Sequence, residues 1–157
     1  KNDWASATIQ PCGGGATRTI GYWKNHWAEL QHAFTVHLGG RMNLGYVTLT
    51  STKQVYDLLW TEPSTADPTM SYAQARIILA RQLAAAILNS TFTNAARLPI
   101  DPVTGKNLVT AGRAAAARTN VWEMLRLADL LDRYNNSGVS VRILDACALA
   151  GSWGLYQ

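Results

Sequence analysis

Three histidines are the side chains of this sequence best suited to bind a metal ion. His26 and Glu29 are three residues apart, a spacing that places two metal ligands on one face of a helix. His37 follows that helix, near two glycines, and could fold back toward them, whereas His32 points to another side of the helix. A metal-dependent enzyme would therefore use His26, Glu29 and His37. No second Cys or His cluster completes the ligand set, so we expect no metal site and no cofactor.

Two carboxylates one helical turn apart, Asp129 and Asp132, have the spacing of an acid/base pair. The neighbouring sequence favours a different interpretation. Glu123 with Arg126, and Asp129 with Arg133, have the spacing of ion pairs on a helix surface. We therefore expect an exposed, ion-paired helix face, and we predict that the protein is not an enzyme.

The segment 21–27, Gly-Tyr-Trp-Lys-Asn-His-Trp, holds three large aromatic residues. Trp23 and Trp27 are four apart and are expected to face a helical core. Tyr22 and His26 share a different face and would be exposed, where their rings could contact a sugar. If the chain binds glycans, Tyr22 and His26 are the predicted contacts.

The two cysteines, Cys12 and Cys147, lie near opposite ends of the chain. A bond between them would close a very long loop and could stabilise the fold by up to about 5 kcal/mol. Cys12 precedes three glycines, and an exposed free thiol is a liability outside the cell. An intramolecular disulfide is therefore favoured, while a disulfide between chains and two free thiols stay open.

The composition predicts a surface that is poor in charge. Apolar residues make up 48% of the chain and charged residues 15%, against roughly a quarter charged in ordinary domains. The net charge of +4 is scattered, without a basic run, a zinc-finger spacing or an RNA-binding motif, so no nucleic-acid partner is expected. No segment reaches the roughly 20 apolar residues that span a bilayer, so the chain is predicted not to cross a membrane.

Hydrophobic periodicity predicts a mainly α-helical, single-domain bundle of four or five helices. Residues 1–16, which include Pro11 and three glycines, form an extended N-terminal arm, and residues 17–157 form the helical domain. Helices are expected at about 20–34, from 51 or 52 onward, at about 71–89, and at about 110–134, with one short two-stranded β element within 42–50.

Local signals refine these elements. Trp23, Trp27, Leu30 and Phe34 recur on one face of the first helix and are expected in the core. Ser71 and Gln74 have the spacing of a capping box at the start of the third helix. The fourth helical region is interrupted at Thr119-Asn120, and residues 139–144 alternate as a short strand does. Asn89-Ser90-Thr91 fits the N-glycosylation pattern beside a helix end.

Three segments carry a resemblance to a known group of proteins: residues 17–26, preceded by Cys12, residues 78–89, and residues 127–136. The first, which contains Gly-Tyr-Trp-Lys-Asn-His, resembles a segment that opens the domain in many uncharacterised secreted bacterial proteins. This sequence departs from that pattern in having Trp27 where a proline often follows the histidine. The resemblance implies an exported protein, often of the cell surface, and it supplies no catalytic residues. The start at Lys1 rather than Met fits removal of a signal peptide or a trimmed sequence.

These observations predict a non-enzymatic extracellular structural protein that self-associates into a surface assembly or filament through its terminal segments. Aromatic and apolar residues near both ends are the expected subunit contacts, namely Trp4, Ile9, Trp153 and Tyr156. The expected partner is another copy of the chain. The alternatives are a glycan- or surface-binding module and, third, a metal-dependent enzyme.

Overall fold

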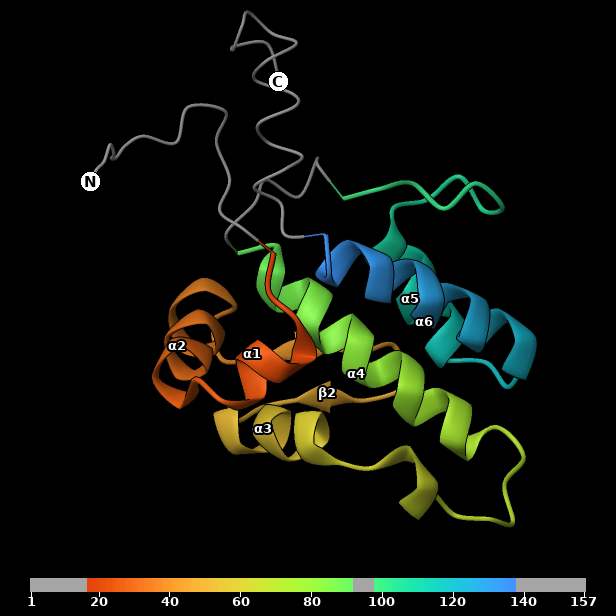
Figure 1. Cartoon of the computed structure of the whole chain (residues 1–157), viewed down its shortest axis with the longest axis horizontal. Coiled ribbons are helices and arrows are strands. Elements are labelled where there is room, and N and C mark those ends of the chain that lie inside the picture. The colour runs from red at the N-terminus through yellow and green to blue at the C-terminus, as the bar shows by residue number, and fades with distance from the viewer. Residues whose placement is uncertain (1–16, 92–97, 138–157) are drawn as a thin grey trace, which may run out of the picture.

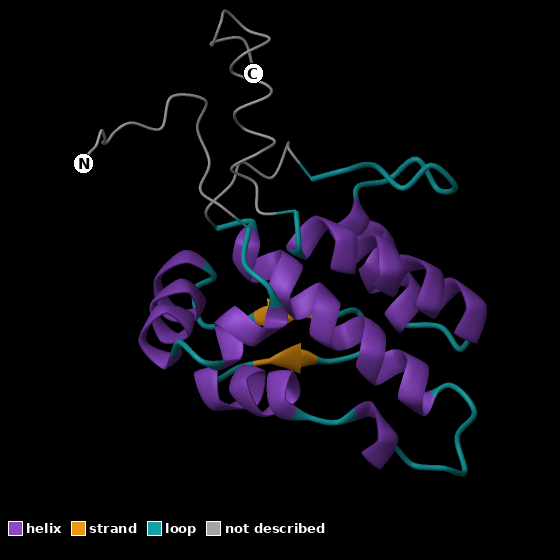
Figure 2. Ribbon diagram, in the orientation of Figure 1, coloured by secondary structure: helices purple, strands orange, loops and turns teal. Residues whose placement is uncertain are grey.

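The structure, a computed structural model, describes residues 17–91 and 98–137, and within these ranges the chain is mainly helical. The described residues form six α-helices that pack together as a bundle, with one short two-stranded antiparallel sheet beside them (Figures 1 and 2). The predicted fold class is therefore confirmed. None of the described helices combines the length and the apolar character needed to cross a membrane.

The predicted helix over 20–34 is wrong as a single element, because the chain divides it at Asn25 and His26. Helix α1 covers Ile20–Lys24 and α2 covers Trp27–His32. Asn25 Nδ2 donates to the Gly21 carbonyl at 2.8 Å, and His26 Nδ1 lies 2.8 Å from the Tyr22 carbonyl oxygen. Side chains thus occupy carbonyls that a continuing helix would bond with its own backbone.

The division of the helix changes which aromatic ring is buried. Trp23, Leu30 and Phe34 lie in the core as expected, but Trp27 is 42% exposed. After α2 the chain continues as a single π-helical turn, η1, over Ala33–His37, in which the Leu38 amide donates to the Ala33 carbonyl at 3.0 Å. The break between α1 and α2 and the π-helical turn each shift the helical repeat, so they change which side chains share a face.

The predicted two-stranded element is confirmed as an antiparallel hairpin. Strand β1, Met42–Asn43, pairs with β2, Thr48–Leu49, so that Met42 lies opposite Leu49. Gly45 in the turn has a φ of +91°, a conformation that favours glycine. The turn lies against a later helix, because Arg113 Nε donates to the Asn43 carbonyl at 2.8 Å.

Helix α3, Thr52–Trp60, begins where the sequence predicts, since Ser51 caps it by accepting from the Gln54 amide. A 3-10 turn, η2, covers Pro63–Thr65. Helix α4 covers Ala73–Asn89, and Tyr72 precedes it without a side-chain cap. The predicted capping box of Ser71 and Gln74 is therefore wrong. Residue 71 belongs to the preceding turn, in which Asp67 Oδ1 accepts from the Thr69 amide at 2.9 Å.

The last described helices are α5, Leu108–Ala116, and α6, Val121–Asn135. The predicted interruption at Thr119-Asn120 is confirmed, and Asn120 caps α6 by accepting from the Glu123 amide at 3.0 Å. Helix α4 lies at the centre of the bundle and packs against α1, α3, α5 and α6 (Figure 1). Gly112 of α5 allows the close approach, because a Cβ there would lie 3.0 Å from Leu83 Cδ1 of α4.

Gly45→Ala should destabilise the protein strongly. The added Cβ would lie 2.1 Å from the carbonyl oxygen of Arg113, and the backbone at +91° already disfavours a side chain. Strain and overlap together should cost about 3 kcal/mol or more in the free energy of unfolding, measured by urea denaturation. Gly40→Ala is the matched control, since Gly40 has a φ of +78° but nothing within 4 Å of the added atom. It should cost about 1 kcal/mol, and equal losses for the two variants would contradict the packing argument.

Candidate functional site

A buried amide, that of Asn89 at the end of α4, connects three parts of the fold. Its Oδ1 accepts from the Arg18 amide at 2.8 Å and from Trp23 Nε1 at 3.1 Å. Its Nδ2 donates to the Arg18 carbonyl and to Asn135 Oδ1, both at 2.9 Å. Because the amide is fully buried and bonded on both sides, it cannot serve as a glycan acceptor in the folded protein.

The same network continues along the interface of α4 and α6. Asn135 Nδ2 donates to the carbonyl of Gln82 at 3.0 Å and to its Oε1 at 2.9 Å. Gln82 Nε2 in turn donates to Asp132 Oδ1 at 3.0 Å, and Asn136 Nδ2 bonds the same oxygen at 2.7 Å. Asp132 is thus a structural acceptor. Asp129 pairs with Arg133 at 2.7 Å on the exposed face, as the spacing predicts.

The hydrogen bonds of Asn89 and Asn135 join the three segments on which the resemblance to secreted proteins rests. Residues 17–26 reach the network through the Arg18 backbone and Trp23, residues 78–89 through Gln82 and Asn89, and residues 127–136 through Asp132 and Asn135. A network in which each polar group has a partner specifies one arrangement of the helices. These segments therefore hold the fold together.

The two terminal segments leave the described domain at the same corner. Thr17 and Ser137, the first and last described residues, lie side by side, with their hydroxyl oxygens 3.1 Å apart (Figure 1). The other predicted contacts and the cysteines lie outside the described residues, namely Trp4, Ile9, Cys12, Cys147, Trp153 and Tyr156, as does the predicted strand over 139–144. The arm over 1–16 lies outside them too.

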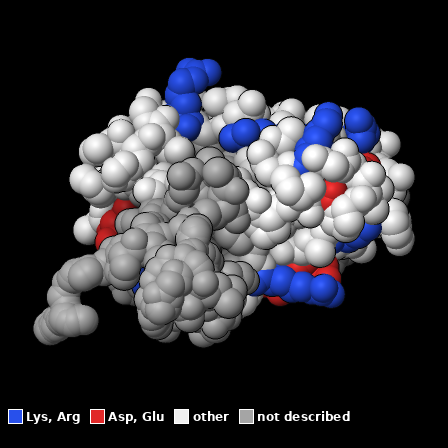
Figure 3. Space-filling view, turned by 90° about the horizontal axis from the view of Figure 1, so that it is seen from above, with Lys and Arg blue, Asp and Glu red and all other residues white. Residues whose placement is uncertain are grey.

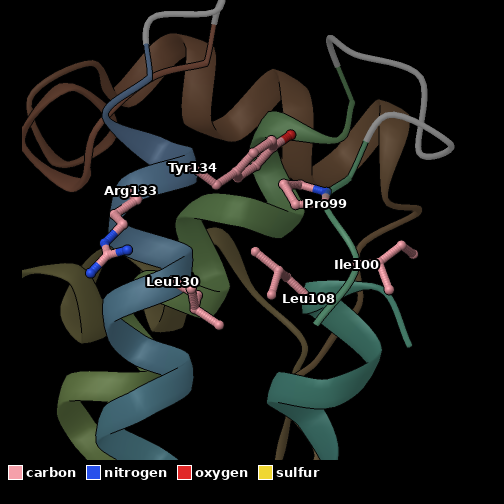
Figure 4. Close-up of a pocket in the computed structure, with 6 residues that line it drawn as sticks. All are labelled: Pro99, Ile100, Leu108, Leu130, Arg133 and Tyr134. Carbon is pink, nitrogen blue, oxygen red and sulfur yellow. The ribbon is translucent and has the colours of Figure 1, made fainter. Parts of the chain in front are cut away.

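An apolar pocket opens close to this corner, with a volume of about 180 Å³. The side chains of Pro99, Leu108, Leu130 and Tyr134 surround the opening, and Ile100 and Arg133 lie on opposite sides of it (Figure 4). Ile100 is 58% exposed. Tyr134 precedes Ser137 by three residues, so the pocket lies beside the point at which the C-terminal segment leaves α6.

A buried ion pair fixes the loop that forms one wall of this pocket. Arg126 of α6 donates to both carboxylate oxygens of Asp101, at 2.6 and 3.1 Å. Asp101, which is fully buried, also accepts from the Thr104 hydroxyl at 2.8 Å and the Val103 amide at 3.2 Å. The hydrogen bonds from Arg126, aided by those of Thr104 and Val103, hold the pKa of Asp101 well below its usual range. The predicted pairing of Arg126 with Glu123 is wrong, because Glu123 pairs with Arg118 at 3.5 Å.

The residues expected to contact a glycan, Tyr22 and His26, stack on each other. Their rings are 3.9 Å apart and nearly parallel, and the Arg18 guanidinium lies 4.5 Å from the Tyr22 ring centre. Both groups lie over the Tyr22 ring, so a sugar would have to compete with them for contact with it. Tyr22 also donates its hydroxyl to the Glu29 carboxylate, a hydrogen bond that raises the pKa of Tyr22. Glycan binding at Tyr22 and His26 stays a prediction.

The structure does not bring His26, Glu29 and His37 together. Glu29 contacts Tyr22, His26 stacks on the same ring, and His37 instead contacts His32. In the ranges 17–91 and 98–137 there is no group of three His, Cys, Asp or Glu residues placed to hold a metal ion.

A second aromatic cluster, formed by Trp27, Tyr56 and Trp60, lies on the surface of α2 and α3. The ring of Trp27 meets Tyr56 edge to face at 5.3 Å, and Tyr56 lies 6.2 Å from Trp60. Trp60 Nε1 donates to the Lys24 carbonyl at 3.1 Å, and Lys24 Nζ lies 4.2 Å from the Trp60 ring centre. Periodicity missed this cluster because it placed Trp27 in the core.

Charged side chains are sparse and scattered on the face seen in Figure 3. Lys and Arg stand there as separate groups, some beside Asp or Glu, with uncharged surface between them. On the part of this face that is described, the charges gather into no single patch of one sign that would attract a polyanion. Comparisons of this chain with protein-family models, with curated proteins and with solved structures found no match.

Proposed function

We propose that this protein is a non-enzymatic structural subunit that self-associates outside the cell through its terminal segments. The observation that carries the proposal is the position of the apolar pocket beside the corner where both terminal segments leave the domain. The occupant that fits it is an aromatic side chain from the C-terminal segment of a second copy, such as Trp153 or Tyr156.

Size and chemistry support this occupant. An apolar opening of about 180 Å³ suits one large side chain. Its lining is mainly aliphatic and aromatic, with the Arg133 guanidinium at the rim, where it can contact the face or the hydroxyl of a bound ring. A C-terminal segment that carries Leu149, Trp153, Leu155 and Tyr156 supplies such side chains.

The remaining surface supports association in place of catalysis. Large apolar side chains stay exposed, among them Trp27 and Trp60, which form one cluster with Tyr56. A contiguous exposed apolar patch is typical of an interaction surface. The carboxylate pair on α6 is engaged in structural bonds, Asp129 with Arg133 and Asp132 with Gln82. The extracellular location in this proposal is supported by the resemblance to secreted bacterial proteins.

Size-exclusion chromatography with light scattering tests the proposal on the full chain. We expect oligomers whose mass rises with protein concentration. Trp153→Ala with Tyr156→Ala should shift the population toward monomer, because the side chains that enter the pocket are lost. Ile100→Lys should do the same, because it places a charge at the wall of the pocket.

Val103→Lys is the matched control, since Val103 belongs to the same loop and is 67% exposed but does not line the pocket. It should leave the oligomers unchanged. A chain that stays monomeric at every concentration would contradict the proposal. A monomeric chain that Ile100→Lys merely destabilises would also contradict the proposal. That result would indicate that the pocket holds the C-terminal segment of the same chain.

A further inference from the structure

The imidazole rings of His32 and His37 lie against each other on the surface. Their ring centres are 5.2 Å apart and their planes meet at 79°, and both residues are exposed. In a regular α-helix, residues five apart point about 140° away from each other. Here the π-helical turn over Ala33–His37, closed by the bond from the Leu38 amide to the Ala33 carbonyl, places them on one face.

The separation of the rings is that of two ligands on one metal ion. With Zn–N bonds of about 2.0–2.1 Å and a tetrahedral angle, two imidazoles on one Zn²⁺ have ring centres about 5 Å apart. Binding would require each ring to direct one of its nitrogens at a common ion. In the structure, with its π-helical turn over Ala33–His37, the two rings already have this separation.

Both rings have nitrogens free of other bonds within the described part of the chain. Neither His32 nor His37 makes a hydrogen bond to another described residue, whereas His26 Nδ1 is held by the Tyr22 carbonyl. Imidazole nitrogen suits Zn²⁺, Cu²⁺ and Ni²⁺, while Ca²⁺ and Mg²⁺ prefer oxygen ligands. π-helical turns are frequent at functional sites, which agrees with a local role for this one.

We propose that His32 and His37 form a surface site for a divalent transition-metal ion of the Zn²⁺, Cu²⁺ or Ni²⁺ class, with water completing the coordination. The site differs from the set that the sequence suggested, because His32 takes the place of His26 and Glu29. It is independent of the proposed self-association, since neither residue lines the apolar pocket.

Calorimetric titration of the untagged full chain with ZnCl₂ tests this site. We expect one ion per chain, and His32→Ala or His37→Ala should each weaken binding at least tenfold, with no further loss in the double variant. Untagged protein should also be retained on a Ni²⁺-charged chelating resin, and either substitution should release it. In ¹⁵N spectra of the histidine rings, Zn²⁺ should shift the nitrogen signals of these two residues.

His26→Ala is the control, because His26 is also exposed and directly precedes α2, the helix that ends at His32. It should bind Zn²⁺ as the unmodified chain does. Circular dichroism should show that the His32 and His37 variants keep the fold, since both side chains are exposed, and the same measurement checks the fold of His26→Ala. Absence of Zn²⁺ binding would overturn the proposal, and so would binding that survives the loss of both rings or that depends equally on His26.

Discussion

Asn89→Ala should lower the free energy of unfolding by about 4 kcal/mol. The substitution removes the acceptor of the Arg18 amide and of Trp23 Nε1, and the donor to the Arg18 carbonyl and to Asn135 Oδ1. Each buried polar group that loses its partner costs about 1–3 kcal/mol, although losses within one network do not add fully. Chemical denaturation followed by circular dichroism measures the effect.

Asn136→Ala is the matched control for Asn89, because it removes the same amide from the end of the neighbouring helix. Asn136 is exposed, and its Nδ2 bonds only Asp132 among the described residues, so its loss should cost about 1 kcal/mol or less. Asn89→Asp should be nearly as harmful as Asn89→Ala, because a carboxylate accepts but does not donate and places a charge in the core. Similar values for Asn89→Ala and Asn136→Ala would refute the central role of this network.

Asp101→Asn should destabilise the protein by about 3 kcal/mol at neutral pH, because it leaves the largely buried Arg126 guanidinium without its carboxylate partner. The loop over 98–107 should open more readily as a result, and amide hydrogen exchange there should speed up. Asp129→Asn provides the comparison. Its pair with Arg133 is more than half exposed, so that variant should lose under about 1 kcal/mol.

The ion pair also predicts how stability depends on pH. The pKa of Asp101 is lower in the folded chain than its unfolded value of about 4. The contribution of Asp101 is therefore fully present above about pH 4 and is lost as the pH falls toward the folded pKa. The difference in unfolding free energy between the native chain and Asp101→Asn should shrink below pH 4. A difference in unfolding free energy that stays constant from pH 7 to pH 3 would mean that ionisation of Asp101 contributes nothing to stability.

Signals confined to a few neighbouring residues predicted much of the fold. Ser51 caps α3 as expected, the interruption at Thr119-Asn120 separates α5 from α6, and the hairpin lies within 42–50. In each of these places the residue that ends or begins an element acts on its own backbone within a few positions. Such interactions are visible in a single sequence because they need no distant partner.

What the sequence did not predict depends on contacts across the chain or on a change of helix type. Arg126 has the spacing to pair with Glu123, yet it bonds Asp101, 25 residues away. His32 meets His37 only because a π-helical turn replaces the α-helical one. Asn25 and His26 each bond a carbonyl four residues back, and α1 ends there. Because the helix is interrupted, Trp27 lies on the surface and not in the core. Helical periodicity assumes a constant repeat and therefore misses all three.

The adjacency of Thr17 and Ser137 has a mechanical consequence. In a filament joined through the terminal segments, tension would be applied to each subunit at two adjacent points of one corner. Most of the helical bundle would therefore not transmit the force. Stretching such a filament should part the ends of α1 and α6 before it strains the centre of the bundle. A covalent link between Cys12 and Cys147 would carry the force past the bundle altogether.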